Sequence, residues 1–323
     1  MWARAVGEPP ILEFRSVGAR RGDFDILRDI TFDLSEGRAS FFMGAAGSGK
    51  SALLKTAAGL RPADSGEVLY RGRSLAHLSR KEEAQFRRKS AFVFQDGALW
   101  ANQSLFDNLA LPVRVHEPGS SPAEVERIVR RVVDLVGYEE DLKTRPSDLS
   151  SGERRLIALA RALVLDPELL FMDEPFANLD EAASERVVGI VAALKERGRS
   201  LVVVTTRSDL VGRFADFIAV LGSGGLMAFG SYDEAVEWNG DAVRALTGRL
   251  KPRAAASEAA WGMAGAWADA FAEDGAVLES EKAGKGANVK RDADGGRAVL
   301  GDIINALPEE DDEAGRGGEE ERT

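Results

Sequence analysis

The sequence predicts an α/β fold with a mostly parallel core sheet, a small antiparallel β subdomain and a helical subdomain. Between residues 39 and 229, short apolar runs typical of strands alternate with segments of helical periodicity. Continuous apolar runs such as residues 201–205 indicate strands that are buried on both faces, as in a parallel sheet. A glycine-rich loop at residues 44–51, between a predicted strand and a predicted helix, belongs to the same class of fold.

The antiparallel subdomain is predicted from the N-terminal part of the chain. Residues 11–17 alternate between apolar and polar side chains, and residues 26–34 predict a second strand after a polar turn around Gly22. Residues 67–70 predict the edge of a hairpin that turns at residues 71–73.

The helical subdomain is predicted at about residues 100–165. Ser121 is a typical helix cap, Pro122 suits the first turn, and Gly137 predicts the end of that helix. The remaining predictions are helices at 52–59, 79–89, 150–165 and 181–195, strands at 39–43, 90–95, 168–173 and 201–205, and a closing hairpin at 217–221 and 226–229.

Composition narrows the class of protein. Hydrophobic residues make up 44% of the 323, which is enough for a large core, and the absence of cysteine excludes disulfides. No apolar run is long enough to span a membrane, and the N-terminus lacks the apolar stretch of a secretory signal, so we expect a cytoplasmic chain. The first 250 residues carry 33 basic and 36 acidic groups, and this near-neutral balance gives no reason to expect nucleic acid as a partner.

Residues 1–250 are expected to form one domain, and residues 251–323 an acidic, mostly disordered tail. The tail holds 9 basic and 17 acidic groups and few aromatic residues. Residues 257–273 and 298–307 are possible short helices. They are either docking motifs for a partner or weak helical tendencies in a solvated tail.

The glycine-rich loop fits the pattern G-x-x-x-x-G-K-[ST] at every required position. Backbone N–H groups and the dipole of the following helix converge there on an anion. We expect Lys50 to reach the β- and γ-phosphates of ATP and the Ser51 hydroxyl to ligate Mg²⁺. The predicted nucleotide-binding residues are Gly44, Ala45, Ala46, Gly47, Ser48, Gly49, Lys50 and Ser51.

Two carboxylates follow the apolar run at residues 169–172. Asp173, at the end of a buried strand beside the phosphate loop, is predicted to hold Mg²⁺ through water. Glu174 is predicted to orient or deprotonate the attacking water.

Further motifs resemble those of the ABC-transporter ATPases. Residues 149–153 (Leu-Ser-Ser-Gly-Glu) are similar to the signature motif of that family, usually Leu-Ser-Gly-Gly-Gln. Gln95 matches the Q-loop glutamine, and Asp180 ends a D-loop run Asn-Leu-Asp. The resemblance covers roughly residues 11–250. It adds Gln95 to the expected catalytic and metal-binding residues. It also adds Ser150, Gly152 and Asp180 to the expected nucleotide-binding residues.

The resemblance implies a subunit that lies on the cytoplasmic face of the cell membrane and works with an integral-membrane permease. Ser150 and the Gly152 N–H, at a helix N-terminus, would form a second anion site for the γ-phosphate held by the other subunit. Two such chains would pack head to tail around two ATP molecules. Bound nucleotide would hold the dimer together, and hydrolysis would let the two chains separate. A homodimer is expected, and a heterodimer with a complete subunit is the alternative.

A narrower resemblance rests on residues 94–100 (Phe-Gln-Asp-Gly-Ala-Leu-Trp) and 106–114. These runs are similar to the Q-loop region of the Mla/Mce-type ATPases, which energise lipid trafficking across bacterial envelopes. The resemblance implies phospholipid as cargo and a lipid-binding Mce-type component as a further partner. Trp100 and Phe106 are then either anchors at the permease or ordinary core residues.

The sequence departs from the family pattern at several positions. Thr206 stands where a switch histidine is expected, and its shorter hydroxyl predicts slower hydrolysis. Ser151 replaces a signature glycine, and Glu153 replaces the signature glutamine. The adenine-stacking aromatic before Gly22 is replaced by two arginines, so either Phe24 or an arginine would contact the base.

Two hypotheses follow. The chain is either a hydrolysing ATPase subunit with Glu174, Lys50, Gln95 and Thr206 as its catalytic residues, or an ATP-binding dimerisation module with little or no turnover. Glu174 favours the enzyme, because a site without turnover has little need of a base. Thr206 and Ser151 favour the module.

Overall fold

The computed structural model describes residues 10–248, 250 and 251, all of which belong to one compact unit of the chain. The predicted disordered tail, with its possible helices at 257–273 and 298–307, lies outside the described residues apart from its first residue. Within the described part, every helix is too short or too polar to cross a membrane.

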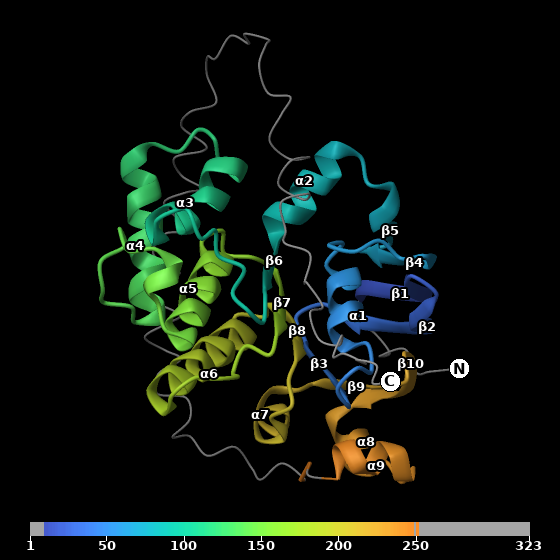
Figure 1. Ribbon diagram of the computed structural model, residues 1–323. Helices are drawn as coiled ribbons and strands as arrows, with labels where there is room; N and C mark the ends of the chain where they lie inside the picture. Colours follow the sequence, from blue (N-terminus) through green and yellow to red (C-terminus); the bar gives the residue numbers. More distant parts are fainter. Residues whose placement is uncertain (1–9, 249, 252–323) are drawn as a thin grey trace, which may run out of the picture. The chain divides into compact units, whose positions relative to one another are not determined.

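Two sheets organise the described residues (Figure 1). The smaller is antiparallel with the order β2-β1-β4-β5, and the larger has the order β10-β9-β3-β8-β7-β6 with parallel pairing from β9 to β6. The fold is therefore the predicted mixture of a mostly parallel core sheet and an antiparallel subdomain. The strands are β1 (Pro10–Arg21), β2 (Phe24–Ser35), β3 (Ala39–Gly44), β4 (Ser65–Tyr70), β5 (Arg73–Ser74), β6 (Ser90–Val93), β7 (Leu169–Asp173), β8 (Ser200–Val204), β9 (Phe217–Gly222) and β10 (Gly225–Ser231).

Helices cover one face of the large sheet, and the small sheet with α1 covers the other (Figure 1). The helices are α1 (Lys50–Ala57), α2 (Arg80–Lys89), α3 (Leu105–His116), α4 (Pro122–Val136), α5 (Ser151–Leu163), α6 (Glu181–Glu196), α7 (Ser208–Phe214), α8 (Tyr232–Val236) and α9 (Asp241–Thr247), with 3₁₀ turns η1 (Leu75–His77) and η2 (Pro146–Asp148).

Alternate residues of the central strands enter two separate cores. In β3, Phe41 packs with the helices on one face and Phe42 with the small sheet on the other, and both are fully buried. Every residue of β7 and β8 is buried. Because both faces are covered, these strands carry the continuous apolar runs from which a parallel sheet was predicted.

Local sequence signals fix the ends of the helices. The α4 helix begins as predicted, since the Ser121 side chain accepts from the Glu124 N–H and the Glu124 carboxylate accepts from the Ser121 N–H. Gly137 ends it in the left-handed conformation, with φ 65°.

Some elements differ from the sequence predictions. The strand predicted at 90–95 ends at Val93, and it is an edge strand in which only Val93 is buried. The α3 helix was expected only as part of a helical region, and α7, α8 and α9 were not predicted. The α7, α8 and α9 helices have 7, 5 and 7 residues, which is too short for a periodic apolar stripe.

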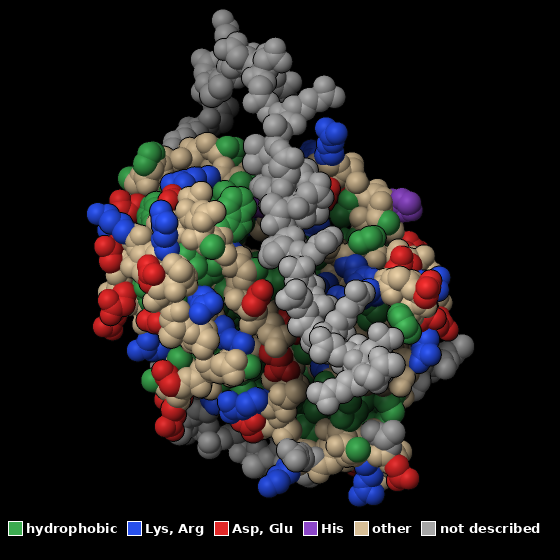
Figure 2. Space-filling model, in the orientation of Figure 1, with side chains coloured by type: hydrophobic (Ala, Val, Ile, Leu, Met, Phe, Trp, Pro, Cys, Tyr) green, Lys and Arg blue, Asp and Glu red, His purple; other side chains and the backbone are tan. Residues whose placement is uncertain are grey.

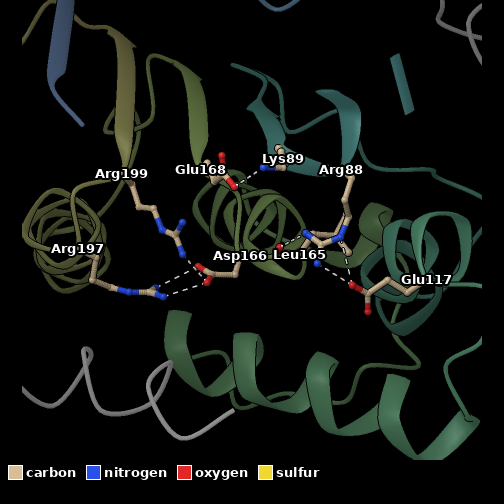
Figure 3. A network of polar contacts seen from close by, with 8 residues as sticks. All are labelled: Arg88, Lys89, Glu117, Leu165, Asp166, Glu168, Arg197 and Arg199. Atoms are coloured by element: carbon tan, nitrogen blue, oxygen red, sulfur yellow. Dashed lines mark hydrogen bonds and ion pairs between the residues drawn. The ribbon is translucent and has the colours of Figure 1, made fainter. Parts of the chain in front are cut away.

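A polar network joins the segments that meet at the amino ends of β6, β7 and β8 (Figure 3). Its centre is Asp166, whose carboxylate accepts from Arg197 and Arg199 at 3.0 and 2.6 Å. Nearby, Arg88 donates to the Leu165 carbonyl and to Glu117, and Lys89 pairs with Glu168. Charge pairing therefore stabilises the amino ends of these strands. Their carboxyl ends lie at the opposite end of the sheet.

On the face shown in Figure 2, acidic and basic side chains of the described residues are interspersed over the helical side of the molecule. Mixed charge of this kind gives no extended field of one sign there.

Candidate nucleotide site

The predicted site lies at the carboxyl ends of β3, β7 and β8. These strands are neighbours in the sheet, and their register pairs Phe42 with Val204 and Val204 with Asp173. The loops that follow therefore emerge at one edge, which is where ligands bind in open α/β sheets. This edge brings together the phosphate loop, the Asp173–Glu174 pair and Thr206.

The phosphate loop depends on glycine. Gly49 has φ 97°, and a Cβ there would lie 2.8 Å from the carbonyl oxygen of Ile26. A Cβ on Gly44 would collide with the carbonyl of Leu221. Gly47 has φ 74° with open space around it, and Ala45 and Ala46 are exposed beside it. Only glycine adopts these conformations without strain, so the glycines determine the shape of the loop.

The loop leaves polar groups available for phosphate. Gly49 caps α1 without a side-chain hydrogen bond, and the first turn of α1 has no acidic residue. The Ser48 hydroxyl is buried and has no hydrogen-bond partner among the described residues. Free N–H groups at a helix start and an unsatisfied hydroxyl are the arrangement that an anion would complete.

Lys50 supplies the positive charge of the loop. Its Nζ donates to the carbonyl oxygens of Gly44 and Ala45 at 2.9 and 2.8 Å. Burial lowers the pKa of the ammonium, and the nearby carboxylates of Glu174 and Asp173 oppose that shift. The side chain is thus held over the loop, close to both acids.

Ser51 and Asp173 provide oxygen ligands of the kind that Mg²⁺ prefers. The Ser51 hydroxyl donates to Asp173 Oδ1 at 3.0 Å, and Asp173 is 3% exposed. Burial raises the pKa of the Asp173 carboxyl, so a bound cation would compensate for its loss of hydration. The described residues contain no cluster of three or more His, Asp or Glu suited to a metal. These two side chains would therefore share the ion with phosphate and water.

Glu174 follows Asp173 in a strained backbone conformation. Its φ is 47°, which costs a non-glycine residue about 1 kcal/mol. Its N–H donates to the Val204 carbonyl at 2.9 Å. Burial raises the pKa of its carboxyl, while hydrogen bonds from the Thr206 N–H and the Thr205 side chain oppose the shift. A raised pKa is what a carboxylate needs to accept a proton near neutral pH.

Thr206 lies beside Glu174, as the motif order implied. Its backbone N–H donates to Glu174 Oε2 at 3.3 Å, and the residue is exposed. The side chain is therefore accessible to solvent.

Gln95 lies in the turn that follows β6, at the carboxyl end of a strand that pairs with β7. The residue is exposed. In the part of the chain that the structure describes, no hydrogen bond joins it to Ser51, Asp173 or Glu174.

The predicted second anion site is a separate feature. Ser150 caps α5, and its hydroxyl accepts from the Glu153 N–H at 3.2 Å. The Glu153 carboxylate accepts from the Ser150 N–H at 2.8 Å. Across the residues that the structure covers, no hydrogen bond or ion pair joins this turn to the phosphate loop. In a single chain the two anion sites are therefore separate.

The Asp180 carboxylate is already used in a helix cap. It caps α6 and accepts from the Ala183 N–H at 2.7 Å. The D-loop lies beside the signature turn, since a Cβ added on Gly152 would be 3.7 Å from the Asn178 carbonyl oxygen.

Two arginines of α5 were missed by sequence reasoning. Arg155 Nη1 donates to the Glu174 carbonyl at 2.7 Å, and Arg161 donates to the carbonyls of Gly97 and Ala98 at 3.0 and 2.7 Å. Burial lowers the pKa of Arg161 to about 10. The available signal was position, because Arg155 lies on the otherwise apolar, buried face of α5.

The residues expected to contact the adenine base differ in exposure and pairing. Phe24 begins β2 and is 79% exposed, whereas Arg20 pairs with Asp25 at 3.1 Å. Trp100 is 42% exposed, and Phe106 is partly buried against the helical core.

Comparison with curated proteins finds several similar ATP-binding subunits. The chain is 30% identical over 228 residues to the intermembrane phospholipid transport ATP-binding protein MlaF of Haemophilus influenzae, and the match covers 70% of this chain and 86% of that protein. It is 28% identical to the methionine import protein MetN of Clostridioides difficile, with 74% of each chain covered. It is 34% identical to the sulfate/thiosulfate import protein CysA of Methylococcus capsulatus, with 69% of this chain and 64% of that protein covered.

A solved structure of an ATP-binding cassette is also similar to this chain. The dimeric, post-hydrolysis form of the ATP-binding cassette MJ0796, bound to ADP and Pi, matches with a TM-score of 0.64 and 27% identity. The match covers 68% of this chain and 98% of that one. Residues 27–177 also match the ABC transporter family, whose ATP-binding subunits dimerise and work with membrane permeases. The MlaF match, the fold and the motif order agree: this chain is an ATP-binding subunit of the ABC transporter family.

Proposed function

We propose that this chain hydrolyses ATP as a homodimer and that its turnover drives a permease that moves phospholipid. The observation that carries the enzymatic part is the geometry of Glu174. Its carboxyl follows Asp173, lies close enough to Lys50 to oppose the shift in the lysine pKa, and accepts from the Thr206 N–H at 3.3 Å. A base with these neighbours is suited to phosphoryl transfer to water.

The proposed reaction uses residues that already lie at this edge of the sheet. Lys50 and the N–H groups of the loop would hold the β- and γ-phosphates of the substrate ATP. Glu174 would accept a proton from the water that attacks the γ-phosphorus, and the bond to the β-phosphate oxygen would break to release ADP and phosphate. Mg²⁺, held by Ser51 and Asp173, would neutralise phosphate charge.

Thr206 is proposed to lower the rate without abolishing it. Its hydroxyl can donate one hydrogen bond to a γ-phosphate oxygen but carries no positive charge. The backbone N–H of Thr206 already serves Glu174, so replacement of this side chain leaves the contact with the base intact.

The test is steady-state ATP hydrolysis by the purified full-length protein with Mg²⁺. We expect measurable turnover that falls by at least about a hundredfold in Glu174→Gln, because the base is lost. The matched control, Glu185→Gln, changes an exposed carboxylate of α6 and should leave the rate unchanged. Thr206→His should raise the rate.

The competing proposal is an ATP-binding module without turnover, which Thr206 and Ser151 favour. It predicts ATP binding without hydrolysis in the native protein and in Thr206→His alike. That result, obtained with the chain mixed with its permease, would refute the enzymatic proposal.

The cargo proposal rests on the Phe-Gln-Asp-Gly-Ala-Leu-Trp run at residues 94–100 and on the 86% coverage of MlaF. MetN and CysA are named for methionine and sulfate, so cargo requires its own measurement. We expect the tagged chain, isolated from detergent-solubilised membranes of its source cells, to carry a permease, a lipid-binding Mce-type component and bound phospholipid. A complex that instead binds methionine or sulfate would contradict this.

A further inference from the structure

The backbone of Glu174 forms a junction between three segments, and its carbonyl oxygen makes two of the contacts. It accepts from Arg155 Nη1 of α5 at 2.7 Å and from the Ala177 N–H at 3.2 Å. The Glu174 N–H meanwhile donates to Val204 at the end of β8. Because Glu174 has φ 47°, these contacts hold a conformation that the residue would otherwise leave.

Arg155 is built into this junction. The residue is 9% exposed and lies on the buried face of α5, four residues after the start of that helix. Burial lowers the pKa of its guanidinium, and the carboxylates of Glu174 and Asp96 oppose the shift. A buried cation must be paired, and the Arg155 guanidinium donates to a backbone carbonyl of the site.

The same end of α5 lies beside the segment that follows Glu174. A Cβ on Gly152 would lie 3.7 Å from the Asn178 carbonyl oxygen and 3.9 Å from the Leu179 side chain. The Ala177 N–H donates to the Glu174 carbonyl at 3.2 Å, so this segment is bonded to the same carbonyl that Arg155 holds. A displacement of α5 would therefore reach Glu174 through Arg155 and through this segment.

We propose that Arg155 is a positioning residue that ties the backbone of Glu174 to the signature helix. Binding of a partner's γ-phosphate at the start of α5 would then set the orientation of the base in the same chain's own site. The inference rests on the proposed function, since it concerns the rate of ATP hydrolysis.

Arginine suits this role better than lysine. Its planar guanidinium offers several donors in a fixed geometry, so it can hold the carbonyl in one orientation. Lysine would offer a single ammonium on a flexible stem and should restore only part of the effect.

The test compares Arg155→Met and Arg155→Lys with Arg154→Met, which removes the exposed arginine next in sequence. We expect Arg155→Met to lower kcat by at least about tenfold, the effect of a displaced catalytic group. The dissociation constant for ATP should stay within about twofold, because the phosphate loop is untouched. Arg155→Lys should recover part of the kcat, and Arg154→Met should match the native protein.

A native kcat in Arg155→Met would overturn the inference, and so would a parallel loss of ATP affinity, which would indicate general damage to the fold. If Arg155→Met does not fold, Arg155→Gln keeps a donor of shorter reach and should show the same selective loss of kcat. An unaltered kcat in that variant would count against the role.

Hydrogen exchange separates this inference from the proposed function. If the native protein does not hydrolyse ATP, the enzymatic proposal fails, and backbone exchange at residues 174–178 still tests Arg155. Faster exchange there in Arg155→Met and not in Arg154→Met supports the tie. Equal exchange in both variants and the native protein refutes it.

Discussion

Two helix starts in this protein, those of α1 and α5, belong to glycine-containing motifs that are expected to contact phosphate, but they are prepared differently. The first turn of α1 has a glycine cap and no acidic residue, and the Ser48 hydroxyl beside it has no hydrogen-bond partner within the described part of the chain. The first turn of α5 is closed by Ser150 and by the carboxylate of Glu153. The comparison indicates that the first site is open to phosphate in the single chain. At the second site, a phosphate must replace the hydrogen bond that the Glu153 carboxylate accepts from the Ser150 N–H.

The difference follows from what each helix start must do without a ligand. The uncapped N–H groups of α1 are tolerated because Lys50 and the glycine conformations hold the loop. The start of α5 is exposed at Ser151, and a capping box stabilises such an end by about 1 kcal/mol. Hydrogen bonds from Ser150 hold the pKa of the Glu153 carboxyl below its usual range.

The largest expected effect comes from glycine at the open site. Gly49→Ala would place a Cβ 2.8 Å from the Ile26 carbonyl oxygen at φ 97°. We expect loss of detectable ATP binding and a fall of about 1–3 kcal/mol in the free energy of unfolding. Gly47→Ala is the matched control for stability, because its φ of 74° adds strain without a collision and should cost less. Thermal unfolding of both variants measures the difference, and equal losses would show that the collision does not matter.

At the closed site, glycine substitution should separate binding from turnover. Gly152→Asp has room, since the nearest atom to its Cβ would be 3.7 Å away, and an acid suits the first turn of a helix. We expect native stability and native ATP affinity with hydrolysis reduced by at least about a hundredfold, because the charge repels the partner's γ-phosphate. Native turnover in this variant would mean that the start of α5 contacts no phosphate.

Removing the charge at the closed site should have the opposite effect. Glu153→Gln keeps an oxygen that can accept from the Ser150 N–H but cancels the negative charge. We expect ATP-dependent dimerisation, measured by sedimentation, to strengthen by about two- to tenfold. Glu185→Gln, which removes an exposed charge elsewhere, serves as the control. Unchanged or weaker dimerisation in Glu153→Gln would show that this carboxylate does not oppose nucleotide.

The smallest effect is expected from the cap itself. Ser150→Ala removes the acceptor for the Glu153 N–H and should lower the free energy of unfolding by about 1 kcal/mol. Ser121→Ala removes the equivalent cap of α4 and should cost about the same. A much larger loss at Ser150 would indicate that the turn has a structural role beyond capping.

The open site was far more predictable from sequence than the closed one. Glycine, lysine and serine at fixed spacing determine the backbone of the phosphate loop, and the apolar runs of β3 and β7 determine that Ser51 and Asp173 meet. The capping box at Ser150 was not predicted, although its residues were visible, because the motif was interpreted only through its resemblance to a phosphate contact. Arg155 was missed because periodicity predicts which face is buried and not which carbonyl a long side chain will reach.

The edges of the fold were also hard to predict. The α7, α8 and α9 helices are held by contacts with the rest of the chain, such as the hydrogen bond from the Tyr232 hydroxyl to the Lys251 carbonyl. Their short sequences carry too few apolar repeats for periodicity to predict a helix.

We propose that each catalytic site combines the open loop of one chain with the closed turn of another. The most direct measurement is ATP hydrolysis by a mixture of two inactive variants, Lys50→Met and Gly152→Asp. Each variant alone lacks one half of every site, whereas a mixed dimer contains one complete site. We predict that the mixture hydrolyses ATP although neither variant does. A mixture as inactive as its components, with both proteins folded and the native protein active, would contradict the claim.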